Sequence, residues 1–199
     1  MGIKRGTLEV GSIFRGSVVI SKVYRGTTVI YELADGTFLE LIEDITVAGS
    51  AVTSVQFSGF TATKEDTLLL VGDIVGGGAN GNGKIYVNGN NTDTNYRVQT
   101  INAYGNVVTA YRASFPNTHD VAVSSSKTLI VIDIKLTNDG YVTLQAQDSH
   151  VYGGASLTMH ERSVSSTFTM SSITQLDITG VANAIGIGSR FSLYKIVGV

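Results

Sequence analysis

The sequence predicts an all-β protein: an antiparallel β-sandwich of jelly-roll type, preceded by a short N-terminal β-strand attachment region. Three observations predict this class. The 199 residues include 23 glycines and one proline, which is typical of many short strands joined by glycine turns. Apolar residues make up 43% and charged residues 15%, so a hydrophobic core is expected and disorder is not. No stretch keeps the 3.6-residue period of a helix for twelve positions.

The first 31 residues contain a short repeat. Residues Ile13–Ile20 are echoed ten positions later by Val23–Ile30. Each unit is an aromatic residue, an Arg and a Gly, followed by two small or β-branched residues and an apolar pair. Because Gly permits a tight reversal, each unit predicts a β-hairpin. A strand at 38–43 follows, and we place a boundary near 44–50, which gives an attachment region at 1–44 and a sandwich domain at 49–199.

The strands of the sandwich follow from alternation of apolar and polar residues. The predicted strands are 52–60, 68–75, 84–87, 96–103, 107–113, 127–136, 141–147, 156–162, 167–170, 176–178 and 190–197. Strands at this spacing are typical of a two-sheet sandwich.

The clearest hairpin lies in the middle of this series. Ile130, Ile132, Ile134 and Leu136 alternate with more polar positions. Residues 137–140, Thr-Asn-Asp-Gly, then supply a turn that tolerates positive φ. The return strand places Val142, Leu144 and Ala146 on one face, so the apolar face of each strand is predicted to line the core.

Charge is uneven along the chain, although the net charge is only −2. Residues 1–31 carry five basic side chains and one acidic, whereas residues 32–73 carry one basic and eight acidic. These are either the solvated faces of different strands or a basic arm that docks on an acidic surface. No dense basic patch interleaves with aromatic residues, so nucleic-acid binding is not predicted. The longest apolar runs are strand-sized, so membrane insertion is not predicted either.

The C-terminal strand is the segment with the most specific resemblance. In Gly188–Ile196, "GSRFSLYKI", Phe191 and Leu193 face one way and Ser192 and Tyr194 the other, which predicts a half-buried strand that closes a sheet. This run resembles the closing strand of small jelly-roll modules in tailed-phage structural proteins. Val23–Glu32, "VYRGTTVIYE", resembles a segment of phage tail and accessory virion proteins, and Asn88–Arg97 is similar to an Asn-rich region of phage jelly-roll modules.

The resemblance implies a non-enzymatic structural protein, located in the virion as a head or tail appendage, that binds other virion proteins and contacts the host surface. A homo-oligomer is expected, because sparse charge leaves apolar faces that a monomer rarely exposes. The resemblance implies threefold symmetry, so a trimer is favoured. Expected assembly residues are Phe14, Arg15, Tyr24 and Arg25, and candidate contacts to a host-surface glycan are Asn90, Asn91, Tyr96 and Arg97. No cofactor and no metal are expected.

Two other function classes stay open. One is a stand-alone carbohydrate-binding β-sandwich, which the absence of Trp disfavours and nine Tyr allow. The other is a jelly-roll hydrolase that uses a pair of carboxylates. No catalytic motif supports an enzyme: Val164 stands where a zinc-protease helix after His160-Glu161 needs a second His, and no G-x-S-x-G occurs. With no cysteine, thiolate chemistry is excluded.

Overall fold

The fold is that of a computed structural model, which describes residues 13–15, 18–20, 22–25, 28–32, 38–77, 81–104, 107–113, 120–123, 127–152, 156–180 and 185–197. Within these ranges nearly every residue lies in a strand, and the only helix is a single 3₁₀ turn, η2 (Asp93–Asn95). The predicted all-β class is confirmed.

The chain forms two compact units, Met1–Leu39 with Val197–Val199, and Glu40–Ile196. In the first unit, β1 (Ile13–Arg15) pairs with β2 (Val18–Ile20), and β3 (Lys22–Arg25) pairs with β4 (Thr28–Glu32). Both pairs are antiparallel and form separate two-stranded sheets. The repeat in the sequence therefore corresponds to two successive hairpins.

The second unit is built from twelve strands. They are β5 (Phe38–Thr46), β6 (Ser54–Ala62), β7 (Thr67–Val75), β8 (Gly81–Val87), β9 (Tyr96–Tyr104), β10 (Val107–Ala113), β11 (Asp120–Val123), β12 (Lys127–Leu136), β13 (Tyr141–Tyr152), β14 (Ser156–Thr169), β15 (Ile173–Gly180) and β16 (Arg190–Val197).

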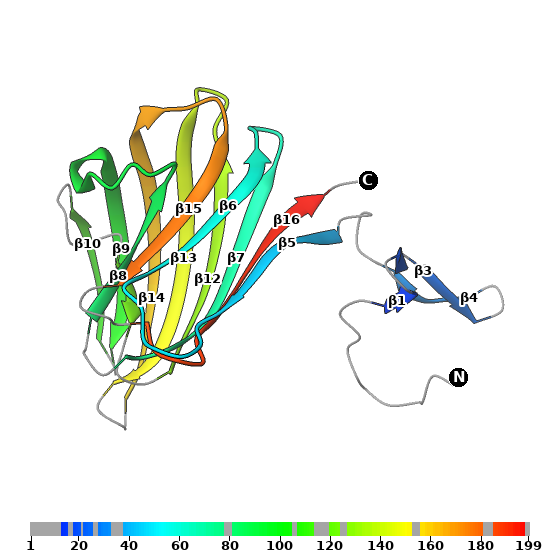
Figure 1. Cartoon of the computed structure of the whole chain (residues 1–199), viewed down its shortest axis with the longest axis horizontal. Coiled ribbons are helices and arrows are strands. Elements are labelled where there is room, and N and C mark those ends of the chain that lie inside the picture. The colour runs from blue at the N-terminus through cyan, green and yellow to red at the C-terminus, as the bar shows by residue number, and fades with distance from the viewer. Residues whose placement is uncertain are drawn as a thin grey trace. The chain divides into compact units, whose positions relative to one another are not determined.

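These strands form two sheets that pack against each other as a sandwich (Figure 1). The broad sheet has the order β10-β9-β14-β13-β12-β7-β16-β5, and the narrow sheet has the order β11-β8-β15-β6. Within each sheet the neighbours pair in a nested manner: β5 lies beside β16, β6 beside β15, β7 beside β12 and β8 beside β11. This nesting is the double Greek key of a jelly roll.

The jelly roll carries an extension on one side. Strands β9 and β10 fall between β8 and β11 in the chain, and β13 and β14 fall between β12 and β15. All four add to the broad sheet beyond β12, so this sheet has eight described strands and the narrow sheet four. The extension is the feature that distinguishes the broad sheet from a four-stranded jelly-roll sheet.

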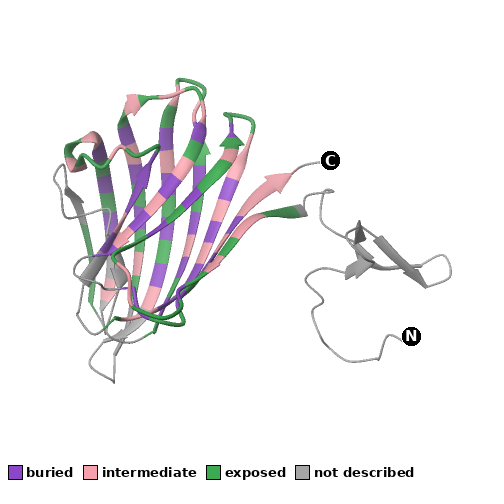
Figure 2. Ribbon diagram, in the orientation of Figure 1, coloured by how far each residue is buried: buried purple, intermediate pink, exposed green. Residues whose placement is uncertain are grey.

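The core lies between the sheets, and the alternation along the strands predicts its residues well. Ile130, Ile132 and Ile134 of β12 are fully buried, as are Phe191 and Leu193 of the closing strand β16. Figure 2 shows buried and exposed residues alternating along β12 and β13. At the β12–β13 turn, Gly140 has a φ of +82°, and a Cβ there would lie 2.9 Å from the carbonyl oxygen of Met170. The turn therefore requires glycine.

The structure corrects several of the predicted strand bounds, and three of the corrections change which strands exist or where they belong. The two strands predicted at 156–162 and 167–170 are one strand, β14, which ends at Thr169 and whose register against β13 shifts between Tyr141 and Thr143. That irregularity interrupts the alternation that the sequence interpretation relied on. Residues 120–123 form β11, which was not predicted.

The third correction concerns the strand at 38–43, which extends to Thr46 and belongs to the broad sheet beside β16. The sequence places the end of the attachment region at residue 44, with the sandwich starting at 49. The compact units divide between Leu39 and Glu40, and the predicted functional division at 44–49 stays a prediction. Asp44 helps to hold β5 beside β16, because its carboxylate accepts hydrogen bonds from Arg190 and Ser192 of β16.

Candidate functional site

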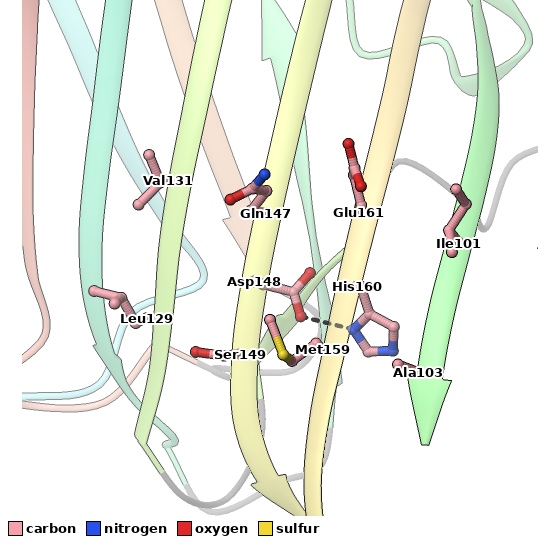
Figure 3. Close-up of a pocket in the computed structure, with 10 residues that line it drawn as sticks. All are labelled: Ile101, Ala103, Leu129, Val131, Gln147, Asp148, Ser149, Met159, His160 and Glu161. Carbon is pink, nitrogen blue, oxygen red and sulfur yellow. Dashed lines mark hydrogen bonds and ion pairs between the residues drawn. The ribbon is translucent and has the colours of Figure 1, made fainter. Parts of the chain in front are cut away.

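The most distinctive surface feature of the sandwich unit is a hollow on the outer face of the broad sheet, at its extended side. It has a volume of about 330 Å³. It is lined by Ile101, Ala103, Leu129, Val131, Gln147, Asp148, Ser149, Met159, His160 and Glu161, from strands β9, β12, β13 and β14 (Figure 3). We call this feature the outer hollow.

Strand register places the lining residues in two rows across the sheet. In one row, Val131 lies opposite Gln147, Gln147 opposite Glu161, and Glu161 opposite Ile101. In the next row, Leu129, Ser149, Met159 and Ala103 are matched in the same way. Because side chains of paired residues project to the same face, the two rows form one continuous surface.

The surface is aliphatic and open. Leu129 is 51% exposed, Met159 55% and Ile101 43%. Exposed apolar residues are ordinary when they are scattered, but these three are gathered in neighbouring rows of one face. Among the described residues, the lining contains no Phe, Tyr or Trp, the residues whose rings most often stack on a sugar.

Three polar side chains, Gln147, Ser149 and Glu161, lie among the aliphatic ones. Glu161 and Gln147 are exposed and lie directly opposite each other. A carboxylate beside an amide can accept hydrogen bonds from a Lys or Arg of a partner. The hollow therefore suits a group that combines an aliphatic body with a cationic or hydrogen-bond-donating tip.

The other two polar lining residues, Asp148 and His160, alternate with these outward residues along β13 and β14, so their side chains point to the opposite face, where they join a buried polar cluster. The Asp148 carboxylate is 2.7 Å from Nδ1 of His160 (Figure 3), and its other oxygen accepts a hydrogen bond from the Arg162 guanidinium. Asp148 and Arg162 are 4% and 7% exposed. The hydroxyls of two other buried residues, Thr100 and Thr128, have no hydrogen-bond partner in the described part of the chain.

This cluster favours the strand register that forms the hollow. A slip of β13 by one residue would move Asp148 to the outer face and leave Arg162 buried without its counter-ion. Leaving one member of a buried ion pair alone is strongly destabilising. His160-Glu161 stands out in the sequence, whereas Asp148 and Arg162 do not, since only the pairing of β13 with β14 brings these residues together.

The residues predicted to contact a glycan lie at the other end of the sandwich, around η2. The Tyr96 ring is buried and packs edge-on against Phe168, with ring centroids 5.7 Å apart. Its hydroxyl donates to the Asn90 carbonyl oxygen and accepts from the Val87 amide. Burial raises the pKa of the Tyr96 hydroxyl to about 12. Tyr96 is thus part of the packing of this turn.

The other three residues of that set differ in exposure. The Asn90 side chain is half-buried and accepts a hydrogen bond from Asn95, whereas Asn91 and Arg97 are exposed. Only these last two side chains are fully presented to solvent. Glycan contact by this set stays a prediction.

The predicted attachment residues occupy equivalent places in the two N-terminal hairpins. Phe14 and Arg15 lie in β1 opposite Val19 and Val18. Tyr24 and Arg25 lie in β3 opposite Val29 and Thr28. Their side chains, like His119, lie outside what the structure describes.

Neither a metal centre nor a membrane-spanning helix is found in the described ranges. No group of three or more His, Asp or Glu side chains there is arranged to hold a metal ion. Among the same residues, no helix has the length and apolar character needed to cross a membrane. Comparison with protein-family models, with curated proteins and with solved structures yields no match to this chain.

Proposed function

We propose that this protein is a non-enzymatic structural component of a tailed-phage virion, displayed as a head or tail appendage, and that it binds a neighbouring virion protein through the outer hollow. The virion assignment is supported by the resemblance of Val23–Glu32, Asn88–Arg97 and Gly188–Ile196 to phage segments. The binding role of the hollow is supported by its geometry. The observation that carries it is the clustering of exposed Leu129, Met159 and Ile101 on one sheet face.

The chemistry of the hollow favours a protein partner. Well-packed cores of protein interfaces are apolar and are surrounded by polar groups that complement the partner. The hollow has this composition, with aliphatic side chains beside Gln147, Ser149 and Glu161. The partner is expected to insert Leu, Ile or Val side chains and to place a Lys or Arg near Glu161.

The N-terminal hairpins supply a second contact in this proposal. Each is a two-stranded sheet with three to five residues in a strand, and such hairpins are marginally stable in water unless they pack on something else. Pairing with the edge of a partner's sheet would stabilise them. Contact with the host surface and a trimeric state within the assembled particle, which the resemblance implies, belong to the same proposal.

The first test asks whether the chain is a virion component. Particles purified by density gradient from the organism that carries the gene should contain the chain in their mass spectrum, at a constant ratio to the capsid protein. Its presence only in the soluble fraction would overturn the proposal.

The second test asks whether the outer hollow makes the contact. Tagged Leu129→Ser and Met159→Ser chains, supplied during particle assembly, should fold and yet fail to enter particles. Ser163→Ala is the matched control, because Ser163 is exposed on β14 outside the hollow lining and bonds only to Gln145. Equal incorporation of all three variants would remove the hollow from the proposal.

The third test concerns the N-terminal region. A chain that begins at Phe38 keeps the whole of β5, so it should remain soluble and unfold cooperatively. It should enter particles less efficiently than the full chain. Loss of the unfolding transition would instead place residues 1–37 in the same folding unit as the sandwich.

A further inference from the structure

Strand β10 (Val107–Ala113) forms one edge of the broad sheet and pairs only with β9 among the described strands. Residues 107–110 are all exposed, with Val107 at 60% and Val108 at 69%. Neighbouring residues of a strand point to opposite faces. Both faces of this part of β10 are therefore open to solvent, together with its unpaired edge.

The opposite edge of the sheet is built differently. Strand β5 carries three acidic residues, Glu40, Glu43 and Asp44, within its nine positions. Charged side chains on an edge strand discourage pairing with another chain. Residues 107–110, Val-Val-Thr-Ala, contain no charge and no proline, so this part of β10 lacks the protection that β5 has.

We propose that β10 is an interface between two copies of this chain, which pair β10 against β10 in antiparallel fashion about a twofold axis. A twofold contact brings the same residues of both copies together near the axis. Like charges there would repel, so the uncharged residues 107–110 place the axis in the part of β10 that precedes Arg112 and meet a requirement that the three acids on β5 would violate. The net charge of −2 adds little repulsion between whole chains.

The interface would be continuous with the outer hollow. Val108 lies opposite Ala103, and Ala110 lies opposite Ile101, so the two aliphatic rows of the hollow end on β10. Pairing of β10 strands extends these rows onto the second copy. The result is one apolar surface that spans both copies, larger than a single chain presents. This inference does not depend on the virion assignment.

The expected dimer is reversible. A pair of seven-residue strands buries less surface than the roughly 1,200–2,000 Å² of a standard stable interface. The mass measured by sedimentation equilibrium should therefore rise with concentration from 21.0 kDa towards twice that value.

The first experiment weakens the edge in the full-length chain. Val108→Lys should raise the dimer dissociation constant at least tenfold while leaving the urea unfolding midpoint of the monomer unchanged. Leu41→Lys is the matched control, because Leu41 is 53% exposed on the opposite edge strand, and it should leave the dissociation constant unchanged. A dimer insensitive to Val108→Lys, or a chain that stays monomeric at all concentrations, overturns the inference.

The second experiment tests the twofold geometry by cross-linking. The chain has no cysteine, so single substitutions to Cys at positions 107 to 110 introduce the only thiol. A disulfide requires Cα atoms about 4.4–6.8 Å apart, so at least one of these variants should form a covalent dimer on mild oxidation, faster than Leu41→Cys. Equal rates at both edges overturn the inference.

The oligomer mass measured by sedimentation equilibrium also distinguishes a failure of this inference from a failure of the proposed function. A trimer with an unreactive β10 edge would contradict twofold pairing and leave the virion proposal intact. A β10-linked dimer in a protein that never enters particles would contradict only the virion proposal.

Discussion

The two outer faces of the sandwich follow the same period-two alternation but present different chemistry. On the narrow sheet, the outward side chains bond to one another: Asp177 accepts from Gln56 at 2.7 Å and from Gln175 at 2.8 Å. Beside this sheet, Asp93 of η2 accepts hydrogen bonds from Lys84 at 2.6 Å and from Tyr86 at 2.8 Å, both residues of β8. On the extended part of the broad sheet, the outward side chains include exposed Leu129 and Met159.

This difference indicates that the polar outer face contributes to folding stability, whereas the aliphatic outer face contributes to binding a partner. Outward side chains that satisfy each other contribute to folding, so their loss should be seen in the unfolding free energy. Exposed aliphatic side chains contribute little to folding, so their loss should be seen in association with a partner. Each prediction below tests one side of this division.

The largest effect is expected beneath the outer hollow. Asp148→Ala leaves Arg162 buried without its counter-ion, and the unfolding free energy should fall by about 3–5 kcal/mol in urea titration. The double variant Asp148→Leu with Arg162→Met should recover much of that loss, because apolar replacement removes the buried charges together. A change of less than about 1 kcal/mol in the single variant would mean that the cluster does not hold the register.

A smaller loss of stability is expected on the narrow sheet. Asp177→Ala removes the acceptor shared by Gln56 and Gln175, and the unfolding free energy should fall by about 1 kcal/mol. Ser58→Ala is the control, because Ser58 lies in β6 on the same face and is exposed. If both variants unfold like the unmodified chain, the polar face does not contribute to stability as proposed.

Substitution in the outer hollow should leave stability nearly unchanged. Met159→Ser should alter the unfolding free energy by less than about 0.5 kcal/mol, which is usual for exposed positions. The same variant should lose incorporation into particles. A loss of stability as large as that of Asp177→Ala would show that the exposed aliphatic side chains of the hollow also stabilise the fold.

The smallest change in stability is expected at β5 and β16, the edge of the broad sheet opposite β10. There the side chains of Asp44, Arg190 and Ser192 form hydrogen bonds with one another. Hydrogen bonds from Arg190, then from Ser192, lower the pKa of Asp44 from its ordinary value of 3.8. A lowered pKa in the folded state means that this contribution to stability is present above pH 3.8 and is lost as the pH falls through the folded value.

The check is a carboxyl titration of Asp44 by NMR. The midpoint should lie below 3.8 in the unmodified chain and return towards 3.8 in Arg190→Gln. An identical midpoint in the two chains would mean that the bond across β5 and β16 is not maintained in solution.

Some of the candidate site could be predicted from local pattern. The strand at 127–136 has Leu129 and Val131 on the face opposite its buried isoleucines. Aliphatic residues on an outward face are therefore a signal of the hollow that is already present in the sequence. Met159 and Ile101 lie in predicted strands, but nothing local indicated that β14 would lie between β13 and β9.

The sequence by itself determined the class, most strands and the inward faces of β12, β13 and β16, because side-chain direction in a strand depends only on the neighbouring residues. The tertiary structure alone decided which strands pair. It placed β5 in the broad sheet, formed the extension β13-β14-β9-β10 and buried Tyr96 against Phe168. It also brought Asp148 to Arg162 and gathered the outer hollow from residues 101 to 161. Strand pairing depends on hydrogen bonds and packing between segments far apart in the chain, which no local periodicity records.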